Sequence, residues 1–261
     1  MKLDIFEYHS FCSTDYLGNP AGVCFVEKLN DIQMQIIATK NNFSETAFIS
    51  RLPKSNEFRI RFFTPNIEID LCGHATVAAA RFLFENYEIN KVTFHANKTQ
   101  LLCNIQENEV SLLLPKQSIR KSNPTTEIQN VLGSECIDFY ETEIHYIGVM
   151  KSFKSLINWK NDFYNSGPYE KDQLILTSEN KDYDYALRMF GSKKLGVKED
   201  PVTGSAQPPL FEYWSKIKNK SKYLTAYQAS HEGGILKVSN NIKGIHIKGE
   251  VKLIKNFIQN I

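Results

Sequence analysis

Short apolar runs, alternating with polar residues or bounded by turn residues, dominate the first third of the chain. Runs of this length and period are typical of β-strands. Turn sequences such as Gly18-Asn19-Pro20 and Thr64-Pro65-Asn66 separate them. The strands predicted in this part of the chain cover residues 3–8, 23–27, 46–49, 58–63 and 67–69.

The remainder of the first half adds one helix and three more strands. Residues 31–40 carry Ile32, Ile36 and Ile37 at helical spacing, and Asp31 is the expected N-cap. The further strands are predicted over residues 92–95, 101–105 and 110–114.

Two other segments are predicted to be buried helices. All but two residues of 75–84 are apolar, which is typical of a helix inside its domain rather than on a surface. Between Gly204 and Ile217, apolar residues recur at helical spacing after two adjacent prolines. Those prolines fit only in a first helical turn, where backbone N–H groups have no partner within the helix.

The sequences before these two helices resemble each other. Each contains an aspartate and a glycine, in Asp70-Leu71-Cys72-Gly73-His74-Ala75 and Asp200-Pro201-Val202-Thr203-Gly204-Ser205-Ala206. Gly204 follows Gly73 by 131 residues, about half the chain, which indicates a weak internal duplication. We therefore predict an α+β fold of two pseudo-symmetric domains, each a curled, mostly antiparallel sheet around a central helix.

The polar stretch 116–126, which contains Pro124 and few large apolar groups, is the predicted linker. It gives domains 1–116 and 125–261, with the last few residues a candidate for packing on the first domain. If the halves face each other, two helix N-termini direct free N–H groups and positive dipole ends into one cleft, which suits a small carboxylate. The alternative is that Gly73 and Gly204 only permit tight turns before packed helices.

Composition narrows the function classes. The chain has 261 residues, with 31 Lys and Arg against 29 Asp and Glu, a net charge of +2. This balance argues against a dedicated nucleic-acid binder, whose affinity needs a basic surface. The acidic residues near the N-terminus and the lack of an apolar run of ~20 residues argue against a signal peptide or a membrane span, so we expect a cytoplasmic protein with no membrane partner. The five cysteines contain no C-x-x-C pair, which argues against a disulfide framework and a zinc knuckle.

Motifs for metal and nucleotide sites are missing from the sequence. The six histidines form no H-E-x-x-H pair, and there is neither a P-loop nor a G-x-G-x-x-G turn. No serine occupies a G-x-S-x-G turn, so a hydrolase of that type is disfavoured. We therefore expect no metal and no cofactor.

The remaining candidate residues are suited to general acid–base catalysis. Glu45 begins a strand whose next residues are apolar, and an apolar setting disfavours the ionised carboxylate, which suits it to proton transfer. His74 and Asp200 precede the two buried helices and are candidates for moving or orienting protons. The alternatives are an exposed Glu45 at a strand start, a His74 that bonds the helix start, and an Asp200 that stabilises the turn before Pro201.

Five ordered motifs resemble those of the phenazine-biosynthesis PhzF-like isomerase family, within the diaminopimelate epimerase-like fold. The resemblance covers nearly the whole chain, extending to Gln228 and Gly233-Gly234. The motifs are Gly18-Asn19-Pro20-Ala21, Asn42-Phe43-Ser44-Glu45-Thr46-Ala47-Phe48, Arg59-Ile60-Arg61-Phe62-Phe63-Thr64-Pro65, Asp70-Leu71-Cys72-Gly73-His74-Ala75-Thr76 and Glu199-Asp200-Pro201-Val202-Thr203-Gly204-Ser205-Ala206.

The resemblance implies a cofactor-independent isomerase and a homodimer. It assigns the general acid/base to Glu45, and places His74 and Asp200 in the active site, where they assist proton movement or substrate binding. It also implies a set of substrate-binding residues for a small carboxylate: Ser44, Gly73, Gly204, Ser205 and, as a looser candidate, Asn19. The member that names the family isomerises dihydro-hydroxyanthranilate by moving a proton across a conjugated ring.

Two alternatives stay open at the level of sequence. Racemases and epimerases of this fold use two cysteines, one before each central helix. Cys72 occupies the first position, but the second offers Asp200 and Thr203 without a cysteine, so a two-thiol racemase lacks half its machinery. A non-catalytic binding protein on the same fold is the other alternative. Gln207-Pro208-Pro209 also departs from the relatives, which often have His, Asn or Cys after the alanine, so the pocket wall is not predicted at this point.

Overall fold

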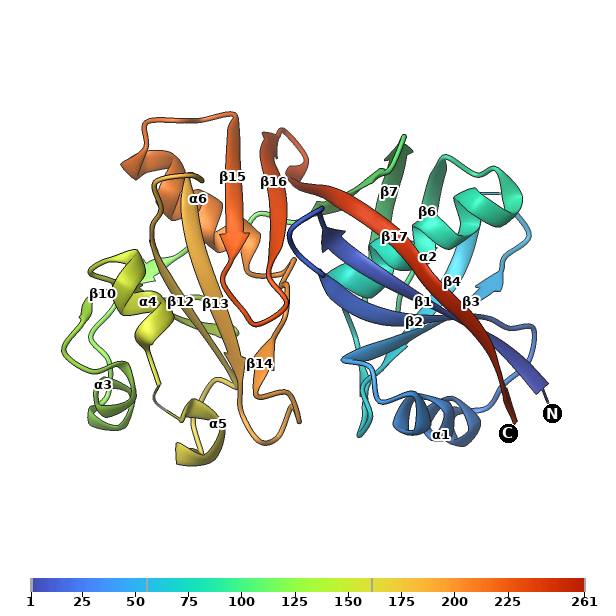
Figure 1. The fold of residues 1–261 in the computed structure, drawn as a ribbon, viewed down its shortest axis with the longest axis horizontal. Helices are drawn as coiled ribbons and strands as arrows, with labels where there is room; N and C mark the ends of the chain where they lie inside the picture. Colours follow the sequence, from blue (N-terminus) through green and yellow to red (C-terminus); the bar gives the residue numbers. More distant parts are fainter. Residues whose placement is uncertain (1, 55, 161, 261) are drawn as a thin grey trace. The chain divides into compact units, whose positions relative to one another are not determined.

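The computed structural model describes residues 2–54, 56–160 and 162–260, and it divides the chain into two compact units (Figure 1). The first unit runs to Leu114 and resumes at His246, and the second is Pro115–Ile245. Both are rich in β-strands and contain few helices, in agreement with the predicted α+β class. Within the described ranges, no helix has the length and apolar content needed to cross a membrane.

In the first unit a sheet surrounds one buried helix, α2 (Gly73–Tyr87), as the apolar run predicted. Ten residues in its first eleven positions are buried, and α2 packs against five strands, β1, β2, β3, β7 and β8. The other elements of this unit are β1 (Lys2–Cys12), β2 (Asn19–Phe25), α1 (Asp31–Asn41), β3 (Glu45–Arg51), β4 (Glu57–Phe63), β5 (Glu68–Ile69), β6 (Lys91–His95), β7 (Gln100–Gln106), β8 (Glu109–Leu114) and nearly all of β17 (Gly244–Asn260).

The second unit has its own sheet and its own core helix, α6 (Gln207–Ile217), of which the first five residues and Trp214 are buried. Trp214 stacks on Tyr185 with ring centroids 5.8 Å apart. The other elements are β9 (Arg120–Lys121), α3 (Thr126–Leu132), β10 (Cys136–Glu141), β11 (His145–Met150), α4 (Phe153–Asn158), α5 (Phe163–Ser166), β12 (Gln173–Glu179), β13 (Tyr185–Gly191), β14 (Glu199–Asp200), β15 (Tyr223–Gln228) and β16 (Gly234–Asn241).

Strand pairing confirms the internal duplication. In the first unit β1 and β2 are antiparallel, β2 and β3 parallel, β3 and β4 antiparallel, β4 and β6 parallel, and β6 and β7 antiparallel. The second unit repeats this order with β10, β11, β12, β13, β15 and β16. In both, a two-residue strand, β5 or β14, pairs with the central antiparallel strand and leads to the buried helix.

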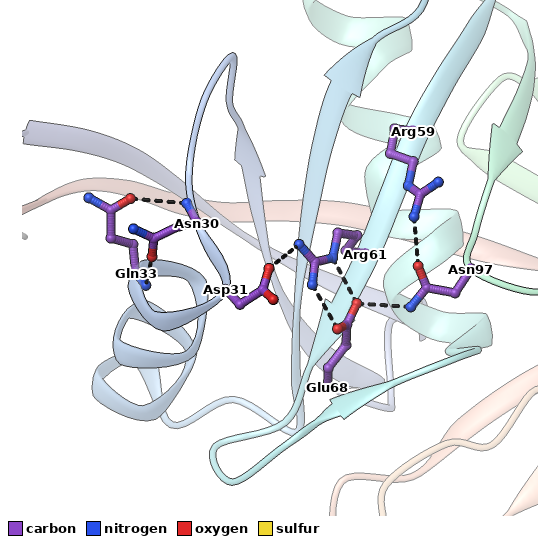
Figure 2. Close-up of polar contacts among 7 residues, drawn as sticks. All are labelled: Asn30, Asp31, Gln33, Arg59, Arg61, Glu68 and Asn97. Carbon is purple, nitrogen blue, oxygen red and sulfur yellow. Dashed lines mark hydrogen bonds and ion pairs between the residues drawn. The ribbon is translucent and has the colours of Figure 1, made fainter.

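An arginine–glutamate pair occurs at the same place in each repeat. Arg61 on β4 donates two hydrogen bonds of 2.7 Å to Glu68 on β5, as Figure 2 shows. Arg188 on β13 donates two hydrogen bonds of 2.7 and 2.9 Å to Glu199 on β14. Because these forked pairs fix both partners, each joins the strand before the buried helix to the body of its sheet.

The unit boundaries differ from the predicted 1–116 and 125–261. Residues 115–124 belong to the second unit because β9, within the predicted linker, pairs with β10. The end of the chain belongs to the first unit because β17 pairs with β1 over nearly its whole length, from Cys12↔Glu250 to Lys2↔Asn260. Thus β9, which follows the first repeat, joins the sheet of the second unit. β17, which follows the second repeat, joins the sheet of the first unit.

The predicted helices of the first half lie within observed elements, and so do the predicted strands, except that 23–27 extends beyond β2 and 67–69 begins before β5. The predicted helix cap was wrong. α1 begins at Asp31, and its N-cap is Asn30 rather than Asp31. Asn30 accepts from the Gln33 N–H while the Gln33 side chain accepts from the Asn30 N–H, a reciprocal pair that Asp31 is one residue too late to make (Figure 2). Asp31 instead forms an ion pair with Arg61.

Candidate active site

Glu45 is the first residue of β3, as the sequence predicted, and its side chain retains 13% of its exposure. Its carboxylate oxygen Oε2 is buried and lies 3.1 Å from Nε2 of His74. His74 is the second residue of α2, and 4% of its side chain is exposed. The structure therefore brings the predicted acid/base and its predicted partner into contact.

Cys72 completes this cluster at the N-cap of α2. Its sulfur lies 3.4 Å from Nδ1 of His74, and its side chain makes no capping hydrogen bond with the helix. One ligand-type atom from each of Glu45, Cys72 and His74 lies within 4.8 Å of the others. The positive end of the 15-residue helix α2 thus faces a carboxyl, an imidazole and a thiol.

Two residues of the neighbouring hairpin hold His74 in place. Ser10 on β1 and Asn19 on β2 are directly paired, and both are fully buried. Ser10 Oγ donates to the backbone carbonyl of His74 at 2.8 Å, and Asn19 Nδ2 lies 3.1 Å from Nδ1 of the ring. Gly18 has φ +77, and a Cβ there would lie 2.5 Å from the Ser10 carbonyl oxygen, so only glycine permits this close approach.

The environment sets the protonation of the cluster. Burial works to lower the pKa of His74, but the negative charges of the Cys72 sulfur and the Glu45 carboxylate outweigh it, and the pKa lies well above its usual value. Burial raises the pKa of the Cys72 thiol to about 11, and the charge of Glu45 adds to the rise. The negative charges that face the ring therefore favour a proton on His74, and burial favours the protonated form of the Cys72 thiol.

Asp200 lies in the second unit, at the end of β14. Thr203 Oγ1 donates to Asp200 Oδ2 at 2.5 Å. Gln228, the last residue of β15, donates through Nε2 to the Asp200 carbonyl at 2.6 Å and accepts from the Thr203 N–H at 2.7 Å. The turn that carries Asp200 is therefore tied to the sheet by one fully buried amide side chain.

The start of α6 corrects one sequence prediction. Two helix N-termini with free N–H groups were expected, but α6 presents none at its first three positions. The Gln207 N–H donates to the Gly204 carbonyl at 3.1 Å, and Pro208 and Pro209 have no N–H. N–H groups for an anion at this end must come from the turn at Gly204 and Ser205, before the helix.

The predicted site residues fall into two groups, one in each unit. Glu45, His74, Asn19, Ser44 and Gly73 belong to the first unit. Asp200, Gly204 and Ser205 belong to the second. The expectation that both groups share one cleft stays a prediction, as does the substrate-binding role of each residue.

The sequence did not predict the supporting roles of Ser10, Gln207 and Gln228. Ser10 carries no motif, and its contact with His74 depends on a strand pairing that sequence spacing does not reveal. Gln228 and Gln207 are single glutamines, whose roles follow from burial rather than from spacing. Only Gly18-Asn19 could have indicated this support from the sequence. A glycine in a turn, next to a residue with an amide side chain, is typical of a close approach between backbone segments.

Comparisons with known proteins agree with the resemblance read from the motifs. The sequence model of a family described as phenazine biosynthesis-like protein matches residues 8–254. An uncharacterized isomerase of Pseudomonas aeruginosa is 34% identical over 257 residues, which cover 97% of this chain and 97% of the relative.

Solved structures are also similar. A phenazine biosynthesis protein of the PhzF family from Enterococcus faecalis has a TM-score of 0.91 and 31% identity, with 100% of both chains covered. A probable proline racemase from Agrobacterium radiobacter shares the fold alone, with a TM-score of 0.66 and 8% identity over 99% of this chain and 92% of that one. The protein thus has an epimerase-like fold, and its chain belongs to the family of phenazine biosynthesis-like proteins.

Proposed function

We propose that this protein is a cofactor-independent isomerase that moves a proton between two carbons of a small unsaturated carboxylate, with Glu45 as the general acid/base. The observation that carries the proposal is the contact between Glu45 and His74 at the uncapped N-terminus of α2. The family supports isomerase chemistry, because its relatives include uncharacterized isomerases.

The two carboxylate oxygens of Glu45 have different surroundings. Oε2 is buried against His74, while 13% of the whole side chain is exposed, and we assign contact with the substrate to the other oxygen, Oε1. In the proposed reaction this oxygen accepts a proton from one carbon, and the conjugated system takes up the electron pair. The resulting carboxylic acid returns a proton to a second carbon. Atoms and electrons balance without any oxidant, reductant or cofactor.

His74 has a supporting role in this proposal. Held by Ser10 and Asn19, its protonated ring keeps Oε2 in one orientation and leaves the other oxygen for the reacting carbon. Proton transfer of this kind contributes a factor of ~10²–10⁴. Positioning of the substrate must supply the rest, and we assign it to first-turn N–H groups of α2 and to Ser44.

A thiol mechanism is less well supported. Racemisation by two thiols needs a thiolate base, and burial raises the pKa of Cys72 to about 11. The residue 131 positions later, before the second buried helix, is Thr203. Its hydroxyl already donates to Asp200. We therefore assign the base to the carboxylate.

The experiment is proton exchange in deuterated water. An amino-cyclohexadiene carboxylate, the class that the resemblance implies, is incubated with the enzyme, and carbon-bound deuterium is followed by NMR. We expect incorporation with the native chain and a loss of ~10²-fold or more with Glu45→Gln. Glu57→Gln is the matched control, since Glu57 lies in the same unit and pairs with Lys54 and His95. Equal incorporation by Glu45→Gln would contradict the proposal.

A further inference from the structure

We propose that the second unit has a binding site for a small organic phosphate, in a hollow lined by the end of α3, the end of β11 and α4. The hollow has a volume of about 760 Å³, which is within the usual size of ligand pockets. All of its lining residues lie between Leu132 and Lys160, so the site belongs to one unit, whereas Glu45 and His74 belong to the other. The inference therefore goes beyond the proposed function and does not depend on it.

The floor of the hollow is apolar and fixed in place. It is formed by Leu132, Met150 and Trp159, which are all buried. Trp159 Nε1 donates to the Val131 carbonyl at 3.1 Å, and the indole packs against Phe190 with ring centroids 4.5 Å apart. Because the indole cannot turn without breaking these contacts, the floor offers a preformed apolar surface to a ring or a short alkyl group.

Three lysines surround this floor. Lys151, Lys154 and Lys160 line the hollow and are exposed, and within the described ranges none of them forms an ion pair with a carboxylate. Among the described residues, Glu135 is the one acid in the lining. The lining therefore carries a net charge of +2, from three lysines and one glutamate.

The carboxylate of Glu135 already has a partner in the wall of the hollow. Ser155 Oγ donates to Glu135 Oε2 at 2.7 Å, so the hydroxyl of Ser152, 2.9 Å away, must be the donor in its contact with Ser155 Oγ. Ser152 Oγ in turn accepts from the Ser155 N–H at 3.1 Å. This chain of hydrogen bonds fixes the carboxylate beside α4, and the three ammonium groups are left for a ligand.

The charge and the apolar floor together define the ligand class. A lysine ammonium is a point charge that suits phosphate, whereas the flat two-oxygen edge of a carboxylate is usually bound by arginine. A phosphate monoester carries a charge of about −1.5 to −2 near neutral pH, which matches the net charge of the lining. An apolar group on the ester can then lie against Trp159 and Met150. We use phenyl phosphate as the probe of this class.

The test is calorimetric titration of the full-length protein with phenyl phosphate. We expect one phenyl phosphate per chain, bound about tenfold or more tightly than inorganic phosphate, because the phenyl ring covers the apolar floor. The triple variant Lys151→Gln, Lys154→Gln and Lys160→Gln should weaken this binding by about 10- to 100-fold, as expected for the loss of three exposed charge contacts.

The matched control is the triple variant Lys181→Gln, Lys193→Gln and Lys222→Gln. These lysines are exposed in the same unit and do not line the hollow, so the control removes the same charge and leaves the lining intact. It should bind phenyl phosphate as the native chain does. Equal weakening in both triple variants would mean that only the overall charge attracts the ligand, and would overturn the site.

Three other results would also overturn the proposal. The first is the absence of phenyl phosphate binding to the native protein. The second is equal affinity for phenyl phosphate and inorganic phosphate, which would mean an adventitious ion only. The third is a loss of binding in Glu45→Gln, which would assign the ligand to the first unit. Native binding in Glu45→Gln supports the site whether or not that variant exchanges protons, so the result is separable from the proposed isomerase.

Discussion

Thr76 and Gln207 make equivalent side-chain hydrogen bonds to the backbone in the two halves of the chain. Thr76 Oγ1 donates to the Cys72 carbonyl at 2.6 Å, and Gln207 Nε2 donates to the Thr203 carbonyl at 2.9 Å. They are 131 residues apart, the same interval as Gly73 and Gly204. In each half a buried side chain therefore fixes the residue that precedes the glycine of the buried helix.

This relationship predicts that removing the two side chains lowers the free energy of unfolding by different amounts. Gln207 also accepts a 2.7 Å hydrogen bond from the Tyr185 hydroxyl, so Gln207→Leu leaves a buried hydroxyl and a buried carbonyl unpaired. We expect a loss of roughly 2–4 kcal/mol in the free energy of unfolding, against ~1 kcal/mol for Thr76→Val. Denaturant titration of both variants measures the difference. Equal losses would mean that Gln207 contributes no more than a simple helix-start contact.

Periodicity was sufficient to predict most of the fold. Strand alternation and the apolar run of α2 are local signals, and the repeated aspartate–glycine pattern indicated the duplication that strand pairing confirms. The sequence placed the last few residues on the first domain but not the register of β17 with β1, because pairing across more than a hundred residues leaves no local trace. β9 was taken as part of the linker because it is only two residues long. The sequence also did not reveal the Arg188–Glu199 pair, equivalent to Arg61–Glu68, because each pair depends on the pairing of a two-residue strand with its neighbour.

The sequence predicted which residues form the candidate site, but not the residues that hold them in place. The motifs identified Glu45 and His74, which the structure brings to 3.1 Å. Cys72 was considered only as one half of a two-thiol pair, and its sulfur lies 3.4 Å from the same ring. The missing N–H donors of α6 follow directly from Pro208 and Pro209, so this error was avoidable from the sequence itself.

Asn19 is predicted to act as a positioning residue for His74. Asn19→Ala removes the contact with Nδ1, so the ring loses its fixed orientation towards Glu45. We expect kcat to fall by about 10- to 100-fold and the pH profile of turnover to shift, because the partner of Nδ1 helps to set the protonation of the ring.

Asn97→Ala is the control for this effect. Asn97 bonds to Glu68 and Arg59 in the same unit (Figure 2). Its removal should leave the pH profile of turnover unchanged. Asn19→Ser, whose hydroxyl still offers a donor and an acceptor, should recover part of the loss. If Asn19→Ala keeps the native pH profile of turnover, Asn19 contributes to packing and does not position His74.

Cys72 is predicted to be dispensable for isomerisation. Because burial raises the pKa of its thiol to about 11, almost no thiolate exists near neutral pH, and Cys72→Ser should retain turnover within about tenfold of the native chain. An essential thiol base would instead lose ~10²–10⁴-fold. Initial rates of deuterium incorporation distinguish these outcomes, and a loss of the larger size would favour the thiol mechanism.

His145 is predicted to make the second unit sensitive to acid. It is fully buried, and burial lowers its pKa to about 4. The folded state therefore favours the neutral ring, while the unfolded chain takes up a proton near pH 6.5. This contribution to stability is fully present above pH 6.5 and declines as the pH falls towards 4.

The expected size of this effect is up to about 3 kcal/mol, the free energy equivalent of the shift from 6.5 to about 4. Denaturant titrations between pH 7 and pH 4 should show a steeper loss of stability in the native chain than in His145→Gln, which carries no titrating ring. His231→Gln is the matched control, because residue 231 is an exposed histidine of the same unit. If native and His145→Gln curves run parallel over this range, the buried ring does not govern the acid response, and the carboxylates must account for it.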